Sequence, residues 1–205
     1  MNIFEQGLSR YLTPGQRDAL GRVLVGIAGA GGIGSNVAQC LVRTGVMRLR
    51  IVDFDTVDPS NLNRQFYFID QTGKPKVIAL KENLLRVNPC LDVDAIAERV
   101  DRENALRLFG GCDLIVEALD IATEKMSLVS SAVSAGIPVL AVSGIAGWGD
   151  SDSIRIRRLQ SGCTVIGDCT SDISAAPPLA PRVALAAAKI ADEVIAAVLD
   201  RQGNA

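Results

Sequence analysis

The chain has 205 residues, of which 48% are hydrophobic and 21% charged, with a formal net charge of −2. This composition is typical of a folded domain with a sizeable core, and it argues against a generic nucleic-acid-binding protein, which usually carries a basic surplus. Because the chain has no histidine, it cannot by itself form a Ser-His-Asp triad, a Cys-His pair or a zinc site with a histidine ligand.

The cysteines and the apolar segments restrict the class further. The five cysteines include no pair at CxxC spacing, so the sequence predicts neither a disulfide framework nor a zinc ribbon. Residues 1–12 carry Glu5 and Arg10 where a signal peptide needs an apolar core. The most apolar stretch, residues 183–199, is interrupted by charged residues and is short for a membrane span. We expect a cytoplasmic protein.

The first part of the chain alternates strand-like and helix-like segments. Residues 23–28 form a continuous apolar run that ends at a glycine cluster, as a strand buried on both faces does. Residues 33–44 show helical spacing, and residues 47–52 form the next expected strand. Residues 53–73 have no clear periodicity, and loops of this length in a compact domain are usually functional. A helix is expected over residues 74–87.

The same alternation continues beyond residue 90. The further expected segments are strands at residues 91–96, 114–116 and 137–142, and helices at residues 102–108 and 124–135. Alternating strands and helices predict an α/β fold, a Rossmann-like and mostly parallel sheet with helices on both faces.

The last third of the chain has a different composition. Glycines surround Trp148 in an expected loop, and residues 154–159 alternate apolar and basic side chains, which predicts an antiparallel strand. A final amphipathic helix follows three prolines, with an apolar stripe formed by Val183, Ala187, Ile190, Val194 and Val198. We interpret residues 1–205 as one domain, with an N-terminal helical arm at 1–22 and a C-terminal extension at 143–205.

The glycine-rich segment GAGGIG at residues 29–34 lies between an expected strand and an expected helix. Glycines allow a tight turn and close approach to a phosphate, and the helix start supplies N–H donors. Asp53 ends the next strand, where an acidic side chain accepts hydrogen bonds from ribose hydroxyls. Together these features predict a nucleotide site, and they leave an NAD(P)-dependent oxidoreductase open.

The segment DFDTVDPSNLNRQ at residues 53–65 favours a triphosphate over a dinucleotide. It places Asp55, Asn61 and Arg64 shortly after the ribose-binding position, and a dehydrogenase has no need of this group. Taken singly, Arg64 and Lys76 could each be a solvated surface cation, and Asp120 could cap the following helix. Asn36, early in the first helix of the glycine motif, is expected to be structural.

Several motifs in family order resemble the adenylation domain of the E1-like superfamily, which includes ubiquitin-activating enzymes and the ThiF, MoeB and HesA proteins. They are GAGGIG, DFD at 53–55, SNLNRQ at 60–65, GKPK at 73–76, and Asp113 with Asp120. The short length and the segments NRQFYF, GIAGWG and PPLAPR are similar to the short ThiF-type branch associated with thiamine biosynthesis.

This resemblance implies ATP and Mg²⁺ as ligands. The implied nucleotide-binding residues are Gly29, Gly31, Gly32, Gly34, Asp53, Asp55, Asn61, Arg64 and Lys76. The implied catalytic set is Arg64, Lys76 and Asp120, with Asp120 holding Mg²⁺, together with Arg10, which would reach into the neighbouring subunit of a homodimer. Ile121 stands where relatives often have an asparagine. Zinc-bearing relatives carry two CxxC pairs, so no structural zinc is expected here.

The implied reaction is the adenylation of a ubiquitin-fold, ThiS-like sulfur carrier protein that ends in Gly-Gly. Its C-terminal carboxylate attacks the α-phosphate of ATP and gives an acyl-adenylate and pyrophosphate, for thiazole synthesis. With a pKa of about 3.5, this carboxylate needs no general base. Cations and N–H donors must instead offset the repulsion between two anions, which is compatible with a chain that lacks histidine.

Several alternatives stay open at this point. The carrier of molybdopterin synthase and a tRNA-modifying activity are possible within the family, and a catalytically silent binding module is a further interpretation. A cysteine desulfurase or thiazole synthase is an expected downstream partner, and no nucleic acid or membrane is expected. Cys163 or Cys169 could form a covalent intermediate, with Cys169 favoured; otherwise each is a small apolar residue.

Overall fold

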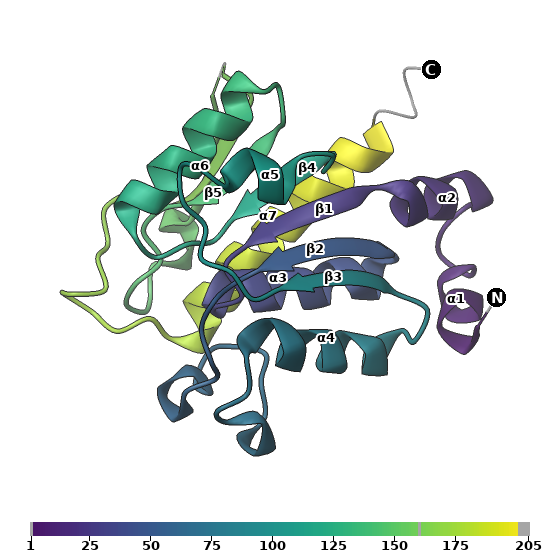
Figure 1. Ribbon diagram of the computed structural model, residues 1–205, viewed down its shortest axis with the longest axis horizontal. Coiled ribbons are helices and arrows are strands. Elements are labelled where there is room, and N and C mark those ends of the chain that lie inside the picture. The colour runs from purple at the N-terminus through teal and green to yellow at the C-terminus, as the bar shows by residue number, and fades with distance from the viewer. Residues whose placement is uncertain (1, 160, 201–205) are drawn as a thin grey trace.

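The computed structural model describes residues 2–159 and 161–200 (Figure 1). Within these residues, a seven-stranded sheet has the order β3-β2-β1-β4-β5-β7-β6. The strands are β1 (Leu24–Ala28), β2 (Arg48–Val52), β3 (Asp92–Ile96), β4 (Leu114–Glu117), β5 (Val139–Val142), β6 (Arg155–Arg158) and β7 (Cys163–Gly167). Neighbouring strands are parallel except β6 and β7. The predicted Rossmann-like fold is therefore confirmed.

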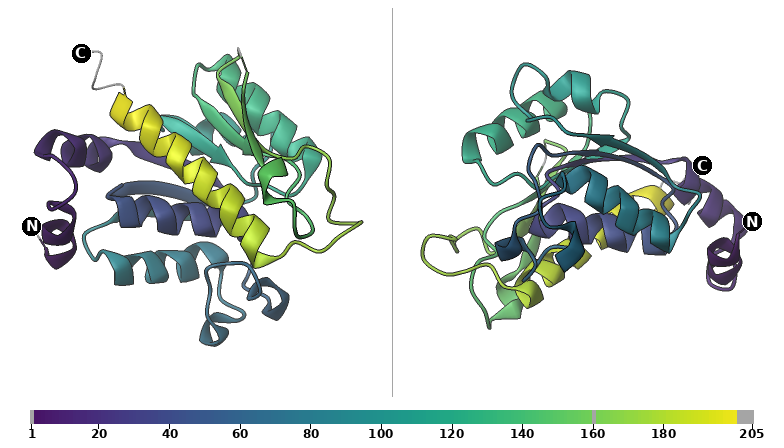
Figure 2. Two further views of the ribbon diagram at one scale, coloured as in Figure 1. Left: turned by 180° about the vertical axis from the view of Figure 1, so that it is seen from behind. Right: turned by 60° about the horizontal axis from the view of Figure 1, so that its bottom comes forward.

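Helices cover both faces of the sheet (Figures 1 and 2). One face carries α3 (Gly32–Thr44), α4 (Lys76–Val87) and α7 (Ala180–Leu199), and the other carries α5 (Ala105–Phe109) and α6 (Ala122–Ser134). A separate hydrophobic cluster lies on each side, one under α3, α4 and α7 and the other under α5 and α6. The central strands β1, β4 and β5 are buried on both faces, which explains their apolar sequences, whereas the edge strand β6 is largely exposed.

The final helix α7 follows the prediction closely. Pro181 lies in its first turn, where a missing N–H leaves no hydrogen bond unmade. The predicted stripe of Val183, Ala187, Ile190, Val194 and Val198 is buried, and α7 packs along α3 (Figure 2, left). The strand predicted at residues 154–159 is β6, whereas β7 was not predicted; it joins β6 to the parallel part of the sheet by pairing with β5.

Two short helices precede the sheet, α1 (Ile3–Leu8) and α2 (Pro14–Arg22). Each begins at a capping box, Asn2 with Glu5 and Thr13 with Gln16, which satisfies backbone donors at the helix start. α1 buries none of its residues. The division into one domain with an arm at 1–22 and an extension at 143–205 remains a proposal; residues 1, 160 and 201–205 of these segments lie outside the described residues.

None of the helices in the described part of the chain has the length and apolar character that crossing a membrane requires.

Candidate functional site

A cleft of about 550 Å³ opens at the carboxyl ends of β1, β2, β4 and β5. The connection after β1 runs to α3 on one face of the sheet, and the connection after β4 runs to α6 on the other. Ligands of open α/β sheets bind at such a topological switch point. The cleft is lined by most of the expected site residues, namely Gly29, Gly31, Gly32, Asp53, Asp55, Asn61, Arg64, Lys76 and Asp120.

The glycines of residues 29–34 have different structural roles. Gly29 has a φ of +95°, and a Cβ there would lie 2.5 Å from the carbonyl oxygen of Ala118, so the glycine loop packs directly on the loop after β4. Gly31 and Gly32 line the cleft. Gly34 does not: it lies in α3, where a Cβ would come within 1.8 Å of the Gly29 carbonyl oxygen. Gly34 therefore allows α3 to approach the strand end.

Asp53 connects the end of β2 to the glycine loop. Its Oδ2 accepts a hydrogen bond from the Ala30 N–H at 2.6 Å, and its Oδ1 accepts one from the Asp55 N–H at 2.8 Å. Burial raises the pKa of this carboxyl, while these two N–H donors and nearby Lys76 oppose the shift. An ionised carboxylate has about four acceptor sites, so Asp53 can still accept hydrogen bonds from hydroxyls of a ligand in the cleft.

Lys76, at the start of α4, is buried with 8% of its side chain exposed, and its Nζ lies 2.7 Å from Asp55 Oδ2. Tyr67 from the preceding loop donates its hydroxyl to the Ala30 carbonyl oxygen at 2.7 Å. Burial raises the Tyr67 pKa, and the charges of Asp53 and Asp55 add to this shift. These contacts fix the position of the Lys76 ammonium relative to the glycine loop.

Arg64 lies over the glycine loop, since a Cβ on Gly32 would be 3.5 Å from its Cγ. Its Nη1 donates to the Ser60 carbonyl oxygen at 3.0 Å and to Asn63 Oδ1 at 2.8 Å. Asn36 donates to the Arg64 carbonyl oxygen at 2.8 Å and so holds this loop on α3, the structural position expected for it. Arg64 thus keeps guanidinium donors for a ligand while its stem is fixed.

Asp120 lines the opposite side of the cleft, in the loop after β4. Its side chain is exposed and has no hydrogen bond or ion pair within the described residues. Those residues also contain no group of three or more Asp, Glu, Cys or His side chains that could hold a metal ion. A single free carboxylate fits Mg²⁺ bound together with substrate phosphates, and does not fit an all-protein metal site.

Arg10 is not brought to the cleft of its own chain. It lies between α1 and α2, is exposed, and has no side-chain partner in the described part of the chain. Figure 1 shows α1 and α2 beside the amino end of β1, away from the carboxyl ends that form the cleft. Asp113 also lies outside the cleft lining, where its carboxylate accepts a hydrogen bond from the Leu24 N–H at 2.8 Å.

An ion pair that the sequence does not predict, with a fully buried carboxylate, lies next to the cleft. Glu117, the last residue of β4, is fully buried and lies 2.5 Å from the Nζ of Lys125, which lines the cleft. Burial raises the pKa of Glu117, and Lys125 opposes this shift. The signal was present: an acidic residue ends an otherwise apolar strand, and buried carboxylates need partners. Gln65 was also missed; it lines the cleft, and its buried Oε1 accepts no hydrogen bond.

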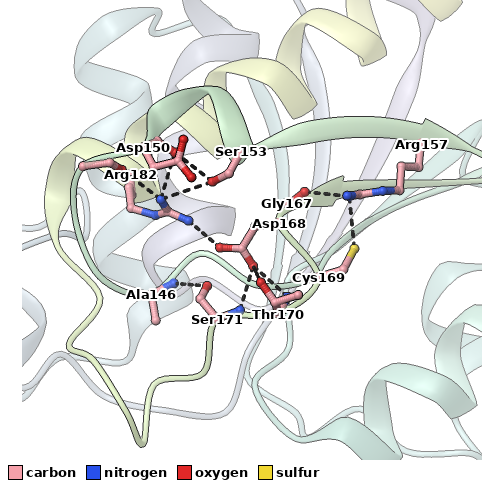
Figure 3. A network of polar contacts seen from close by, with 11 residues as sticks. Ala146, Asp150, Ser153, Arg157, Gly167, Asp168, Cys169, Thr170, Ser171 and Arg182 are labelled. Atoms are coloured by element: carbon pink, nitrogen blue, oxygen red, sulfur yellow. Dashed lines mark hydrogen bonds and ion pairs between the residues drawn. The ribbon is translucent and has the colours of Figure 1, made fainter.

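A second polar network fixes the rim of the cleft (Figure 3). Arg182 of α7 donates to the carbonyl oxygens of Gly149 and Asp150 and forms an ion pair of 2.5 Å with Asp168. The other Asp168 oxygen accepts hydrogen bonds from the N–H groups of Thr170, at 2.8 Å, and Ser171, at 2.7 Å. Partial burial opposes ionisation, but these donors prevail and lower the Asp168 pKa to about 2.

The two candidate cysteines differ in environment. Cys163 is buried in β7, and burial raises the pKa of its thiol, as expected of a small apolar residue. Cys169 follows Asp168 with a φ of +61° and is exposed, and its Sγ lies 3.2 Å from Nη1 of Arg157 (Figure 3). Neither thiol lines the cleft.

The profile of the ThiF family matches residues 6–204. Among similar proteins, a sulfur carrier protein adenylyltransferase of Thermus thermophilus is 37% identical over 128 residues, which cover 62% of this chain and 47% of that protein. The tRNA threonylcarbamoyladenosine dehydratase 2 of Saccharomyces cerevisiae is 34% identical over 146 residues, covering 69% and 33%. This chain therefore spans less than half the length of these two curated relatives.

Solved structures share the fold over nearly the whole chain. The crystal structure of Escherichia coli tRNA N6-threonylcarbamoyladenosine dehydratase, TcdA, in complex with AMP has a TM-score of 0.86 and 18% sequence identity, and the match covers 97% of this chain and 95% of that one. At this identity the likeness concerns the fold.

Proposed function

Since the chain belongs to the ThiF family, we propose that it adenylates the C-terminal carboxylate of a ubiquitin-fold sulfur carrier protein. One observation carries this proposal: a single cleft brings together the glycine loop, Asp53, Arg64, Lys76 and Asp120. A carboxylate oxygen of the carrier attacks the α-phosphorus of ATP. The bond from that phosphorus to the bridging oxygen breaks, and pyrophosphate leaves with the electron pair.

The residues of the cleft bind and orient the two anions. Asp53 accepts hydrogen bonds from the ribose, and the N–H groups of Gly31 and Gly32 face the phosphates. Arg64 and Lys76 offset charge that moves toward the leaving pyrophosphate. Asp120 would hold Mg²⁺, which neutralises phosphate charge when it is bound with ATP. The attacking carboxylate arrives ionised, so no residue has to remove a proton.

Acidic side chains outnumber basic ones in the cleft. This indicates that further cations, from outside one chain, are needed to bind a triphosphate. The described lining of the cleft contains three cationic side chains, Arg64, Lys76 and Lys125, and twice as many acidic ones. Ion pairs balance Lys76 and Lys125 as well as the acidic Asp55, Glu98 and Glu124, which leaves Arg64 against Asp53, Asp120 and Asp172. A triphosphate and a carboxylate would therefore meet a net negative surface. We propose that Mg²⁺ at Asp120 and Arg10 from the second copy of a homodimer supply the missing positive charge.

Within the family we propose a ThiS-like carrier for thiazole synthesis, with a cysteine desulfurase or thiazole synthase as the next partner, in the cytoplasm. Activation of the carrier of molybdopterin synthase is the alternative closest in chemistry. A second candidate is ATP-dependent activation of a carboxylate on a modified tRNA nucleoside. The similarity to the yeast dehydratase favours it, whereas the net charge of −2 disfavours a tRNA partner.

Exchange of radiolabelled pyrophosphate into ATP tests the proposal. Exchange should require a carrier protein with an intact terminal glycine, and the same carrier lacking that glycine is the matched control. Offering ThiS-like and molybdopterin-synthase carriers in parallel separates the two carrier classes. Exchange that instead depends on tRNA carrying threonylcarbamoyladenosine would replace the proposal with the second candidate. No exchange combined with tight NAD binding would identify an oxidoreductase.

The variant Arg64→Ala should abolish exchange, because it removes a cleft guanidinium whose stem lies over the glycine loop. If this variant still supported the function in cells, the chain would be a binding module without catalysis.

A further inference from the structure

We propose that Glu117 is a positioning residue: it fixes the loop of residues 118–121 so that Asp120 faces the cleft ready to bind Mg²⁺-ATP, and Lys125 keeps Glu117 in place. This inference rests on the proposed function. Neither Glu117 nor Lys125 is among the site residues that the sequence predicts; the geometry around the cleft points to both.

The Glu117–Lys125 pair joins β4, α6 and β5 and holds the loop after β4. Its Oε2 lies 2.5 Å from the Lys125 Nζ on α6, and its Oε1 accepts a hydrogen bond from the Leu119 N–H at 2.8 Å. The Lys125 Nζ also donates to the carbonyl oxygen of Val142, the last residue of β5, at 3.0 Å. The end of β4, the loop after it, the start of α6 and the end of β5 are thus tied at one buried point.

The loop is held on both sides of Asp120. Before it, the Ala118 N–H donates to the Ala28 carbonyl oxygen at 2.8 Å, and the Leu119 N–H donates to Glu117. After it, the Lys125 N–H donates to the Ile121 carbonyl oxygen at 3.0 Å and closes the first turn of α6. The Asp120 side chain itself has no partner in the described residues. A fixed backbone that carries a free carboxylate is a preorganised ligand, which needs no rearrangement when it binds a cation.

Stability alone does not account for this ion pair. Glu117 is completely buried and Lys125 keeps 24% of its side chain exposed, so the pair loses much of its contact with water, which is expensive. Replacing such a pair by apolar residues of similar volume is often neutral or stabilising. The pair also lies where Lys125 borders the cleft and where the Leu119 N–H needs an acceptor. The location of this ion pair beside the cleft therefore explains it better than a contribution to the stability of the fold.

Two double variants separate the hydrogen bond from the charge pair. Glu117→Leu with Lys125→Met removes both charges and the acceptor of the Leu119 N–H. Glu117→Gln with Lys125→Met removes the same charges but keeps an amide oxygen as the acceptor. Arg158→Met with Glu193→Leu, at the other edge of the sheet, is the matched control, because it removes an exposed arginine and its ion-pair partner on a helix.

Two measurements apply to all three variants and the wild type. The first is the dissociation constant of a fluorescent ATP analogue, with and without Mg²⁺. The second is the hydrogen-exchange rate of the Leu119 amide. In the variant Glu117→Leu with Lys125→Met, we expect the gain in affinity that Mg²⁺ gives to be about tenfold smaller than in the wild type. Its Leu119 amide hydrogen should also exchange faster. Without Mg²⁺ the Leu/Met and Gln/Met variants should bind the analogue alike, because both lack Lys125. With Mg²⁺ the Gln/Met variant, which keeps an acceptor for the Leu119 N–H, should retain more of the gain than the Leu/Met variant, and the control should behave like the wild type.

The proposal is overturned if a folded Leu/Met variant keeps the Mg²⁺-dependent gain, or if the Gln/Met variant loses as much as the Leu/Met variant. Should the Leu/Met variant not fold, Glu117→Met with Lys125→Met replaces it, because methionine adapts to irregular spaces. Wild-type protein that binds no nucleotide would refute the proposed function. In that case, the exchange rate at Leu119 still decides whether Glu117 holds the loop.

Discussion

Replacing Gly34 by alanine tests the geometry on which the cleft depends. A Cβ at this position would lie 1.8 Å from the Gly29 carbonyl oxygen, whereas real Cβ atoms essentially never come closer than 3.0 Å to a neighbour. The obstacle is backbone, so no flexible side chain can give way. The start of α3 and the end of β1 must instead separate by about 1 Å, and this displaces the glycine loop between them.

The expected magnitude follows from two opposing effects. Overpacking of a core costs about 1–3 kcal/mol, and a rigid neighbour places Gly34→Ala at or above the upper end of that range. The gain in helix propensity from glycine to alanine offsets about 1 kcal/mol. The free energy of unfolding should therefore fall by about 2 kcal/mol or more, and the melting temperature by about 4–8 °C in a chain of this size.

Gly21 in α2 is the matched control for this experiment. A Cβ there would have only the Met47 Cγ nearby, at 3.8 Å, which is ordinary contact. Gly21→Ala should therefore raise the unfolding free energy by about 0.5–1 kcal/mol through helix propensity. Urea unfolding of both variants, with binding of a fluorescent ATP analogue to the folded protein, measures the contrast. If the two variants differed by less than about 0.5 kcal/mol, close packing of Gly34 on Gly29 would be refuted.

Three further predictions concern charged residues. Lys76→Met should lower carrier-dependent pyrophosphate exchange about 100-fold. Lys74→Met removes an exposed ammonium paired with Glu82 and should leave the exchange unchanged. Equal effects of the two variants would contradict a special role for Lys76. Arg10→Ala should abolish exchange without changing the melting temperature, and mixing it with Arg64→Ala should restore activity in heterodimers that have one intact site; inactive heterodimers would contradict a shared site. Asp168→Asn should destabilise the fold by about 3 kcal/mol at pH 7, because it leaves Arg182 buried without its partner. The folded pKa of Asp168 is lowered to about 2, so its stabilisation is present above about pH 4 and is lost as the pH falls toward 2. In urea unfolding, the free energies of unfolding of the variant and the wild type should therefore become similar at low pH. A difference that does not change with pH would contradict the ion pair.

The sequence predicts the elements whose contacts repeat along the chain, and misses those that depend on distant partners. The apolar run of β1 indicates a strand buried on both faces, and the stripe of α7 shows which residues of that helix are buried. β7 carries no such pattern. Its five residues, Cys163–Gly167, form a strand because β5 pairs with it from more than 20 residues earlier in the chain. Thr164, Val165 and Ile166 favour a strand by propensity, but so short a segment has no periodic pattern to support that preference.

The missed residues of the site have a similar cause. Glu117 ends β4, and its partner Lys125 lies in α6. Asp168 directly follows β7, and its partner Arg182 lies in α7. Glu117 ends an apolar strand and so carries a signal of its own, whereas Lys125, Asp168 and Arg182 lie in segments where solvated charges are common. Their importance comes from burial, since a charge without water needs a partner. Burial is set by how β4, β5, β7 and α7 pack together, and that arrangement exists only in the folded chain.

The glycine motif shows how far a pattern can be interpreted. In sequence, Gly29, Gly31, Gly32 and Gly34 belong to one phosphate-binding signature, and all four were assigned to the nucleotide. In the structure, Gly31 and Gly32 line the cleft without a close backbone neighbour, whereas Cβ atoms on Gly29 and Gly34 would collide with carbonyl oxygens. Gly31 therefore leaves room for a ligand, and Gly29 and Gly34 leave room for the protein itself. Gly32 does both, since it lines the cleft and a Cβ there would lie 3.1 Å from Val183 Cγ1. A substitution at Gly31 should accordingly weaken nucleotide binding without destabilising the fold. A substitution at Gly34 should lower both the nucleotide affinity and the stability of the fold.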